Sequence, residues 1–226
     1  MNITALANSP WFLALRPALQ MALSDAMQSR TYHPGQFIHQ AGDPPSGFYG
    51  VCEGRVRVSR NALSGREILL AILEPGSWFG EISSFDNKPR THDAVAEGTV
   101  TLAVIAQARF DALLDTHPEF YREFITLLCS RVRGAFQFID AGALLTQRQQ
   151  LIRRLTMLMT SYGQQQDVSE PVTLQISQES MAHMINSSRQ TVNRVLQELA
   201  KDGLVKIEYG RVRIPDPVAL QQASQA

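Results

Sequence analysis

Residues 176–216, ISQESMAHMINSSRQTVNRVLQELAKDGLVKIEYGRVRIPD, carry the pattern that decides the fold. Ser177 is placed to cap one short helix, and Ser187 or Ser188 to cap a second. Between them, Asn186 occupies a turn position that favours a residue tolerant of positive φ. Two short helices joined by such a turn predict a helix-turn-helix. Apolar residues define an inner face on each helix: Met181, Ala182 and Ile185 on the first, and Val192, Val195, Leu196 and Leu199 on the second.

The segment after the second helix, GLVKIEYGRVRI, predicts a β-hairpin that turns near Tyr209-Gly210 and would form a wing. In such motifs the first residues of the second helix enter the major groove of DNA. Arginine suits the O6/N7 edge of guanine, glutamine suits adenine, and hydroxyls suit phosphates. A lone amphipathic helix would favour a solvated face with no partner, but the complete helix–turn–helix–wing order favours DNA binding. The predicted DNA-contacting residues are Ser188, Arg189, Gln190, Thr191, Asn193 and Arg194.

Upstream, a long helix is predicted from about residue 116 to about residue 145. Thr116-His117-Pro118-Glu119 resembles a capping box at its start. Apolar residues then alternate spacings of three and four, which is typical of a coiled-coil seam and predicts a partner helix. Packing against the chain's own β domain is the alternative, and we expect both, on different faces. The predicted dimerisation residues are Ile125, Leu128, Val132, Ala135 and Ile139.

The first third of the chain predicts many short strands after a small helical start. Turn signals at Pro34-Gly35, residues 41–45 and Glu53-Gly54 separate alternating or apolar runs. Short strands at regular spacing are typical of a β-barrel or sandwich. We therefore expect a β domain over residues 1–115, the long helix over 116–146, and the DNA-binding domain over 147–226.

Within the β domain, GSWFGEISSFDNKPRTHDA, residues 76–94, places an Arg-Thr pair nine residues beyond a Gly-Glu pair. Glu81 and Arg90 could form a salt bridge with each other. They could also hold the two ends of one ligand, with the arginine on an anion and the carboxylate on hydroxyls. The segment alone leaves both interpretations open.

The composition is that of an ordinary globular protein: 226 residues, 44% hydrophobic and 19% charged, with zero net charge. No apolar run is long enough to span a membrane, and the N-terminus lacks the pattern of a secretion signal, so a cytoplasmic location is expected. Cys52 and Cys129 belong to no CxxC pair or Cys/His cluster, so no metal site is expected. No nucleophile–base set or Walker loop is present, so we do not expect an enzyme.

From about Tyr32 to Pro215 the chain resembles the Crp/Fnr family of bacterial transcription regulators, most clearly in SSRQTVNRVLQEL and FGEISSFDNKPRTHDA. The resemblance implies an α+β fold with an N-terminal cyclic-nucleotide-binding β-roll, a long dimerisation helix and a C-terminal winged helix-turn-helix. It implies a homodimer that binds double-stranded DNA in response to a small effector such as cyclic AMP or cyclic GMP. RNA polymerase is then a further expected partner.

In nucleotide-binding members of the family, the Gly-Glu and Arg-Ser or Arg-Thr pairs form a phosphate-binding cassette. Carried over, Gly80 offers a backbone contact, Glu81 accepts from the ribose 2′-hydroxyl, and Arg90 and Thr91 bind the cyclic phosphate. Ile82 is a further expected effector-binding residue. The helix positions that contact adenine in cyclic-AMP-binding members correspond to Ala135 and Phe136, which cannot make those hydrogen bonds. The resemblance therefore leaves the effector's identity open.

Two alternatives to an effector-controlled regulator remain. One is a regulator of the same family that acts without a ligand and keeps a vestigial cassette. The other is a cyclic-nucleotide-binding regulatory subunit of an enzyme. The helix-turn-helix argues against the regulatory subunit, because such a subunit needs no recognition helix.

Overall fold

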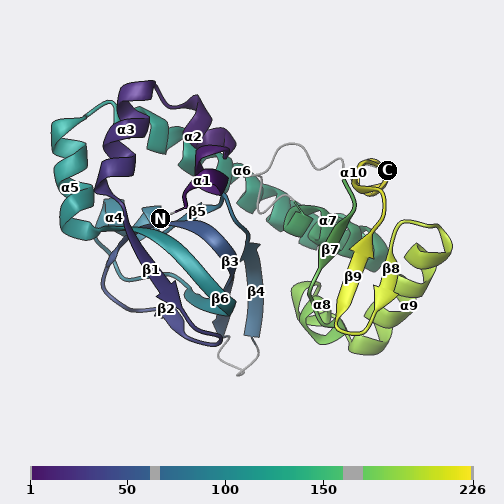
Figure 1. Cartoon of the computed structure of the whole chain (residues 1–226). Coiled ribbons are helices and arrows are strands. Elements are labelled where there is room, and N and C mark those ends of the chain that lie inside the picture. The colour runs from purple at the N-terminus through teal and green to yellow at the C-terminus, as the bar shows by residue number, and fades with distance from the viewer. Residues whose placement is uncertain (1, 62–66, 160–169, 225–226) are drawn as a thin grey trace. The chain divides into compact units, whose positions relative to one another are not determined.

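The computed structural model describes residues 2–61, 67–159 and 170–224, together with their side chains except those of residues 61, 67 and 137–144. The chain divides into two compact units: Met1–Arg60 with Ala71–Val132, and Asn61–Leu70 with Arg133–Ala226. None of the described helices is long and apolar enough to cross a membrane. The elements that Figure 1 labels are, in chain order, α1 (Thr4–Ala7), α2 (Pro10–Ala14), α3 (Pro17–Ala26), β1 (Gln28–Tyr32), β2 (Phe37–His39), β3 (Gly47–Asn61), β4 (Glu67–Leu73), β5 (Trp78–Phe79), α4 (Glu81–Asp86), β6 (Asp93–Ala106), α5 (Gln107–Thr116), α6 (Phe120–Leu144), α7 (Gln147–Met159), β7 (Val172–Leu174), α8 (Gln178–Met184), α9 (Arg189–Lys201), β8 (Lys206–Glu208), β9 (Arg211–Ile214) and α10 (Pro217–Ala223).

The β domain contains one antiparallel sheet in the order β1-β6-β3-β4, with β2 also paired to β6 and β5 to β3. The two long strands β3 and β6 pair along most of their lengths, and their register shifts around Glu53. There Gly54 has a φ of +76°, and a Cβ atom would lie 2.3 Å from the carbonyl oxygen of Thr99. The sequence predicted a turn at Glu53-Gly54. The structure instead has a bulge inside a continuous strand, because the residues on both sides stay paired with β6.

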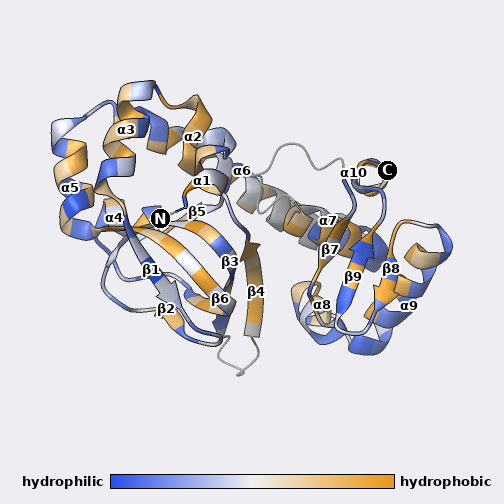
Figure 2. Ribbon diagram, viewed as in Figure 1, coloured by the Kyte–Doolittle hydropathy of each residue, from blue (hydrophilic) through white to orange (hydrophobic). Residues whose placement is uncertain are grey.

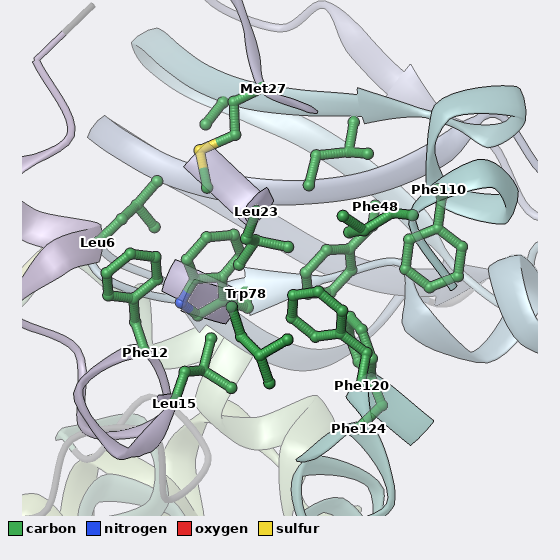
Figure 3. Packing of buried hydrophobic residues seen from close by; sticks show 14 of the residues in the cluster. Leu6, Phe12, Leu15, Leu23, Met27, Phe48, Trp78, Phe110, Phe120 and Phe124 are labelled. Carbon is green, nitrogen blue, oxygen red and sulfur yellow. The ribbon is translucent and has the colours of Figure 1, made fainter. Parts of the chain in front are cut away.

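An aromatic cluster forms the core of the β domain (Figure 3). Phe48 stacks on Trp78 with ring centres 5.3 Å apart, and Phe124 of α6 meets the edge of Phe48 at 5.1 Å. The indole N–H of Trp78 donates to the Ser9 hydroxyl at 2.9 Å, and that of Trp11 donates to the Glu123 carbonyl at 3.1 Å. The N-terminal helices therefore close this core and attach the beginning of α6 to it.

The long helix α6 begins at Phe120, so the predicted capping box at Thr116 is wrong. Residues 107–116 form a helix of their own, α5, which buries Phe110, Leu113 and Leu114. Thr116 ends α5, and its hydroxyl donates back to the carbonyl of Ala112 at 2.8 Å. The Thr116 hydroxyl, which was predicted to cap the start of α6, is therefore hydrogen-bonded within the last turn of α5.

A capping box does occur at the start of α7. The backbone N–H of Gln149 donates to the Thr146 hydroxyl at 3.3 Å, and the backbone N–H of Thr146 donates to the Gln149 side-chain oxygen at 3.1 Å. This reciprocal pair satisfies two of the N–H groups that a helix start leaves open. The start of α7 is therefore fixed by Thr146 and Gln149.

The helix-turn-helix and its wing are confirmed. The Ser177 hydroxyl caps α8 by accepting from Ser180 N–H at 3.0 Å, and the Ser188 hydroxyl caps α9 by accepting from Thr191 N–H at 3.1 Å. Asn186, in the turn between them, has a φ of +47°. Beyond α9, the antiparallel pair β8 and β9 turns through residues 209–210, and β7 completes a sheet in the order β7-β9-β8.

Candidate anion site and nucleic-acid interface

Arg90 is a buried charge held by backbone oxygen atoms, and its side chain is only 3% exposed. Its Nη1 donates to the Gly80 carbonyl at 2.8 Å, and its Nη2 donates to the Gly47 carbonyl at 2.6 Å and the Ser46 hydroxyl at 3.2 Å. Within the described residues, no carboxylate forms an ion pair with Arg90. The guanidinium is therefore hydrogen-bonded but, in the described part of the chain, has no counter-ion in contact.

The surroundings of Arg90 favour an anion. Burial lowers the pKa of the guanidinium, and its Cζ lies 5.4 Å from the ring centre of Tyr49. The Nε of Arg90 is buried without a hydrogen-bond partner among the described residues. A buried charge is costly unless it is paired, and an unused buried donor adds to that cost. An anionic ligand would supply both the missing charge and an acceptor.

Gly80 packs closely against both Gly47 and Arg90. It has a φ of +95°, and a Cβ atom there would lie 2.9 Å from the Gly47 carbonyl oxygen and 3.0 Å from Nη1 of Arg90. Any side chain would therefore strain the backbone and press on the guanidinium. The residue type predicted from the motif is thus required by the packing around Arg90.

Glu81 pairs with Arg131 of α6, so the salt bridge with Arg90 that the sequence left open is not formed. The Glu81 side chain is only 5% exposed, and its Oε1 lies 3.4 Å from Nε of Arg131. Arg131 also donates through Nη2 to the Trp78 carbonyl at 2.5 Å. Sequence reasoning missed Arg131, although its spacing from Phe124 and Leu127 places it on the buried face of α6, where a charge needs a partner.

The remaining predicted effector residues are exposed. The Thr91 hydroxyl is hydrogen-bonded to Nδ1 of His92 at 2.8 Å, and Ile82 is 45% exposed on α4. Ala135 and Phe136 are exposed on α6 and belong to the other compact unit. The structure therefore brings Gly80 and Arg90 into contact beside Glu81, while a role for Ala135 and Phe136 in ligand binding stays a prediction.

His39 is a second buried titratable group close to this site. It is 8% exposed, and its ring centre lies 6.1 Å from those of Tyr49 and Phe79. Its Nδ1 is buried without a partner among the described residues. Burial and the nearby charge of Arg90 lower the pKa of His39 to about 4. The imidazole is therefore neutral at physiological pH.

We expect the free energy of unfolding to fall by about 2 kcal/mol between pH 7 and pH 5 because of His39. The unfolded chain takes up a proton on this histidine near pH 6.5, whereas the folded chain does so only near pH 4. The stabilisation is therefore complete above pH 6.5 and is lost as the pH falls towards 4. Urea denaturation at both pH values should show this loss in the wild type and in the exposed control His33→Phe. The variant His39→Phe should lack it, and an unchanged pH dependence in that variant would contradict the assignment.

Helix α9 presents most of the predicted DNA-contacting side chains on one exposed face. Figure 2 shows its hydrophilic and hydrophobic residues alternating around the helix, and Arg189, Gln190, Asn193 and Arg194 are all exposed. The Oδ1 of Asn193 accepts from Nε2 of Gln178 on α8 at 3.3 Å. The hydroxyls of Ser188 and Thr191 are hydrogen-bonded to each other at 2.9 Å at the cap. Ser188 and Thr191 therefore have a structural role at the start of α9.

The predicted dimerisation face of α6 carries exposed apolar side chains. Ile125 is 58% and Val132 50% exposed, Leu128 is half-buried and Ala135 is exposed, while the side chain of Ile139 lies outside the described residues. A neighbouring face of the helix is buried in the β domain through Phe120, Phe124 and Leu127. A run of exposed apolar residues along one helix face is typical of a surface that binds a partner.

Comparison with known proteins identifies two domains in the chain. The model of the cyclic nucleotide-binding domain matches residues 29–117, and that of the Crp-like helix-turn-helix domain matches residues 149–223. The chain is 32% identical over 215 residues to the cyclic AMP receptor protein of Thermus thermophilus, covering 95% of this chain and 96% of the relative. It is 27% identical over 220 residues to the CRP-like cAMP-activated global transcriptional regulator of Mycobacterium tuberculosis, covering 97% and 98%.

The solved structure of the Thermus thermophilus catabolite activator protein matches with a TM-score of 0.53 and 32% identity, over 96% of this chain and 99% of that one. The predicted α+β fold with a nucleotide-binding-type β domain and a C-terminal helix-turn-helix is confirmed. The Mycobacterium tuberculosis relative is named as a transcriptional regulator, in agreement with the expectation of a non-enzyme. The chain therefore belongs to the Crp/Fnr family of DNA-binding transcription regulators.

Proposed function

We propose that the protein is a homodimeric, sequence-specific regulator whose affinity for DNA is controlled by a cyclic nucleotide. The observation that carries the effector proposal is the burial of Arg90 with no carboxylate in contact among the residues that the structure describes. A cyclic phosphate has one negative charge and oxygen acceptors that suit a guanidinium. Two relatives are named for cyclic AMP, which supports the same ligand class here.

The cassette residues have distinct roles in this proposal. Arg90 binds the phosphate through its unused donors, and Thr91 donates its exposed hydroxyl to the same group. Glu81 accepts a hydrogen bond from a ribose hydroxyl. Because Glu81 is also paired with Arg131 of α6, a ligand on Glu81 acts on the helix that we assign to dimerisation. This ion pair gives the effector a physical connection to α6.

By thermodynamic linkage, operator DNA must tighten effector binding by the same factor as the effector tightens operator binding, typically about 1–3 kcal/mol. Titration calorimetry with cyclic AMP and cyclic GMP, in the absence and presence of operator duplex, tests this reciprocity. Binding of one nucleotide that strengthens with DNA supports the proposal. A protein that binds its operator but neither nucleotide would be a ligand-independent regulator with a vestigial cassette.

The expected partners follow from this function. The recognition helix favours double-stranded DNA over the alternative of an enzyme's regulatory subunit, since only a DNA-binding protein uses that helix. A DNA-binding regulator acts where the chromosome lies, which supports the cytoplasmic location expected from the sequence. Contact with RNA polymerase is proposed on the family membership alone.

Arg189→Ala is expected to weaken operator binding by about 1–3 kcal/mol and to relax the preference at one symmetric base pair, most simply a guanine. Arg189 is exposed in the first turn of α9, where groove-facing residues lie. Binding of wild type and variant to operators with each base at that position measures both effects. An equal loss of affinity on every sequence would instead make Arg189 a phosphate contact. Arg153→Ala, which removes the same charge from α7 of the same domain, is the control.

A further inference from the structure

The two arginines on the exposed face of α9 differ in their surroundings. Arg189 forms no ion pair within the described residues. Arg194, further along the helix, is paired with Glu198: its Nη1 lies 2.6 Å from Oε1 of that carboxylate. Both members of the pair are accessible, with the Arg194 side chain 63% and the Glu198 side chain 41% exposed. One arginine is therefore free to reorient, and the other is held.

Helix stability does not account for Glu198. The residue lies in the last turn of α9, where a negative charge faces the negative end of the helix dipole. An acid placed four residues after its base is also the weaker order for a pair on one helix. A carboxylate on a DNA-facing helix adds repulsion from the phosphates. The contact that offsets these costs is the one with Arg194.

We propose that Glu198 is a specificity-determining positioning residue for DNA recognition, a role that rests on the DNA-binding function proposed for α9. It holds the Arg194 guanidinium along the helix, so that the remaining donors meet one base edge and do not turn to the nearest phosphate. Without Glu198, the Arg194 side chain would gain affinity from the nearest phosphate in any sequence, whereas the held side chain gains mainly where a matching acceptor lies opposite. Because the pair is neutral, it also adds little to the salt-dependent, non-specific part of binding.

The test compares Glu198→Gln with Glu179→Gln, which removes the same charge from the exposed first turn of α8. The DNA probes are an operator selected from random duplexes by the wild type, the same operator substituted at the base pair that Arg194→Ala ceases to distinguish, and an unrelated duplex. Glu198→Gln should lower the preference between the first two probes about fivefold, the low end of one arginine's contribution. For the unrelated duplex, the slope of log affinity against log salt concentration should become steeper by about one for each recognition helix.

The control Glu179→Gln should shift affinity for all three duplexes alike and keep the operator preference. In the double variant Arg194→Ala/Glu198→Gln, the preference should equal that of Arg194→Ala alone, because the glutamate then has nothing to orient. If Glu198→Gln keeps the wild-type preference and matches Glu179→Gln in salt slope, Glu198 contributes only charge and the inference is wrong. If the wild type itself prefers no operator, the proposed function fails, and the inference fails with it.

Discussion

Replacing Arg90 by alanine is expected to abolish the effect of cyclic nucleotide on operator binding. Removing one partner of a buried charge pair costs about 3–5 kcal/mol, which corresponds to a loss of nucleotide affinity of roughly a hundredfold to several thousandfold. Arg90 is the buried cation of the cassette, and its Nε has no partner among the described residues. Titration calorimetry measures the affinity, and operator binding with and without nucleotide measures the response.

The structure predicts that Arg90→Ala also lowers the stability of the fold. Arg90→Ala removes no large apolar area, so the residue type alone would predict an intact fold. The guanidinium, however, supplies the donors for the Gly47 and Gly80 carbonyls. A buried group that loses its partner costs about 1–3 kcal/mol, so we now expect a free energy of unfolding lower by about that amount. Urea denaturation measures this loss and sets the conditions in which binding is assayed.

Arg109→Ala is the matched control for Arg90→Ala, because Arg109 is an exposed arginine of the same domain. It should keep both nucleotide binding and the DNA response. Arg90→Lys keeps the charge but has a single ammonium in place of the planar fork, so its affinity should fall between those of wild type and Arg90→Ala. Wild-type nucleotide affinity in a folded Arg90→Ala protein would show that the effector binds elsewhere.

The sequence predicted the DNA-binding domain well because its signals are local. Ser177 and Ser188 cap helices within four residues of their own position, and Asn186 sets its own backbone conformation. Caps and turns of this kind are determined by neighbours along the chain. The same local argument failed at Thr116, because its hydroxyl donates to the Ala112 carbonyl of α5, a helix that was not predicted.

The anion site could be predicted only in part, because its partners are distant in sequence. The motif identified Gly80, Glu81 and Arg90. One interpretation paired Glu81 with Arg90, and the other placed the two side chains at the two ends of one ligand. The folded chain gives Glu81 a cation from α6 and gives Arg90 carbonyl oxygens from β3 and the β5–α4 turn. Backbone acceptors carry no signature in the side-chain sequence, so only tertiary structure can reveal them.

Val132→Asp is expected to turn the proposed dimer into a monomer at micromolar concentration and to lower operator affinity at least a hundredfold. Val132 is 50% exposed on the apolar face of α6, and two-fold symmetry would place two aspartates in one seam. Burying an unpaired charge at an interface costs several kcal/mol, and each copy contributes one. Sedimentation measures the oligomeric state, and a binding titration measures the affinity for the operator.

The affinity should fall with the dimer because two linked recognition helices bind two half-sites as one event, with a high effective concentration for the second contact. The control is Thr126→Asp, which adds the same charge to an exposed position of α6 outside the apolar face. That variant should remain dimeric and bind DNA as the wild type does. The Val132→Asp monomer should still bind a single half-site as weakly as one wild-type domain would, because α9 is unchanged. A monomeric Val132→Asp protein with full operator affinity would show that α6 does not determine DNA binding. A variant that stays dimeric would instead show that the copies associate through another surface.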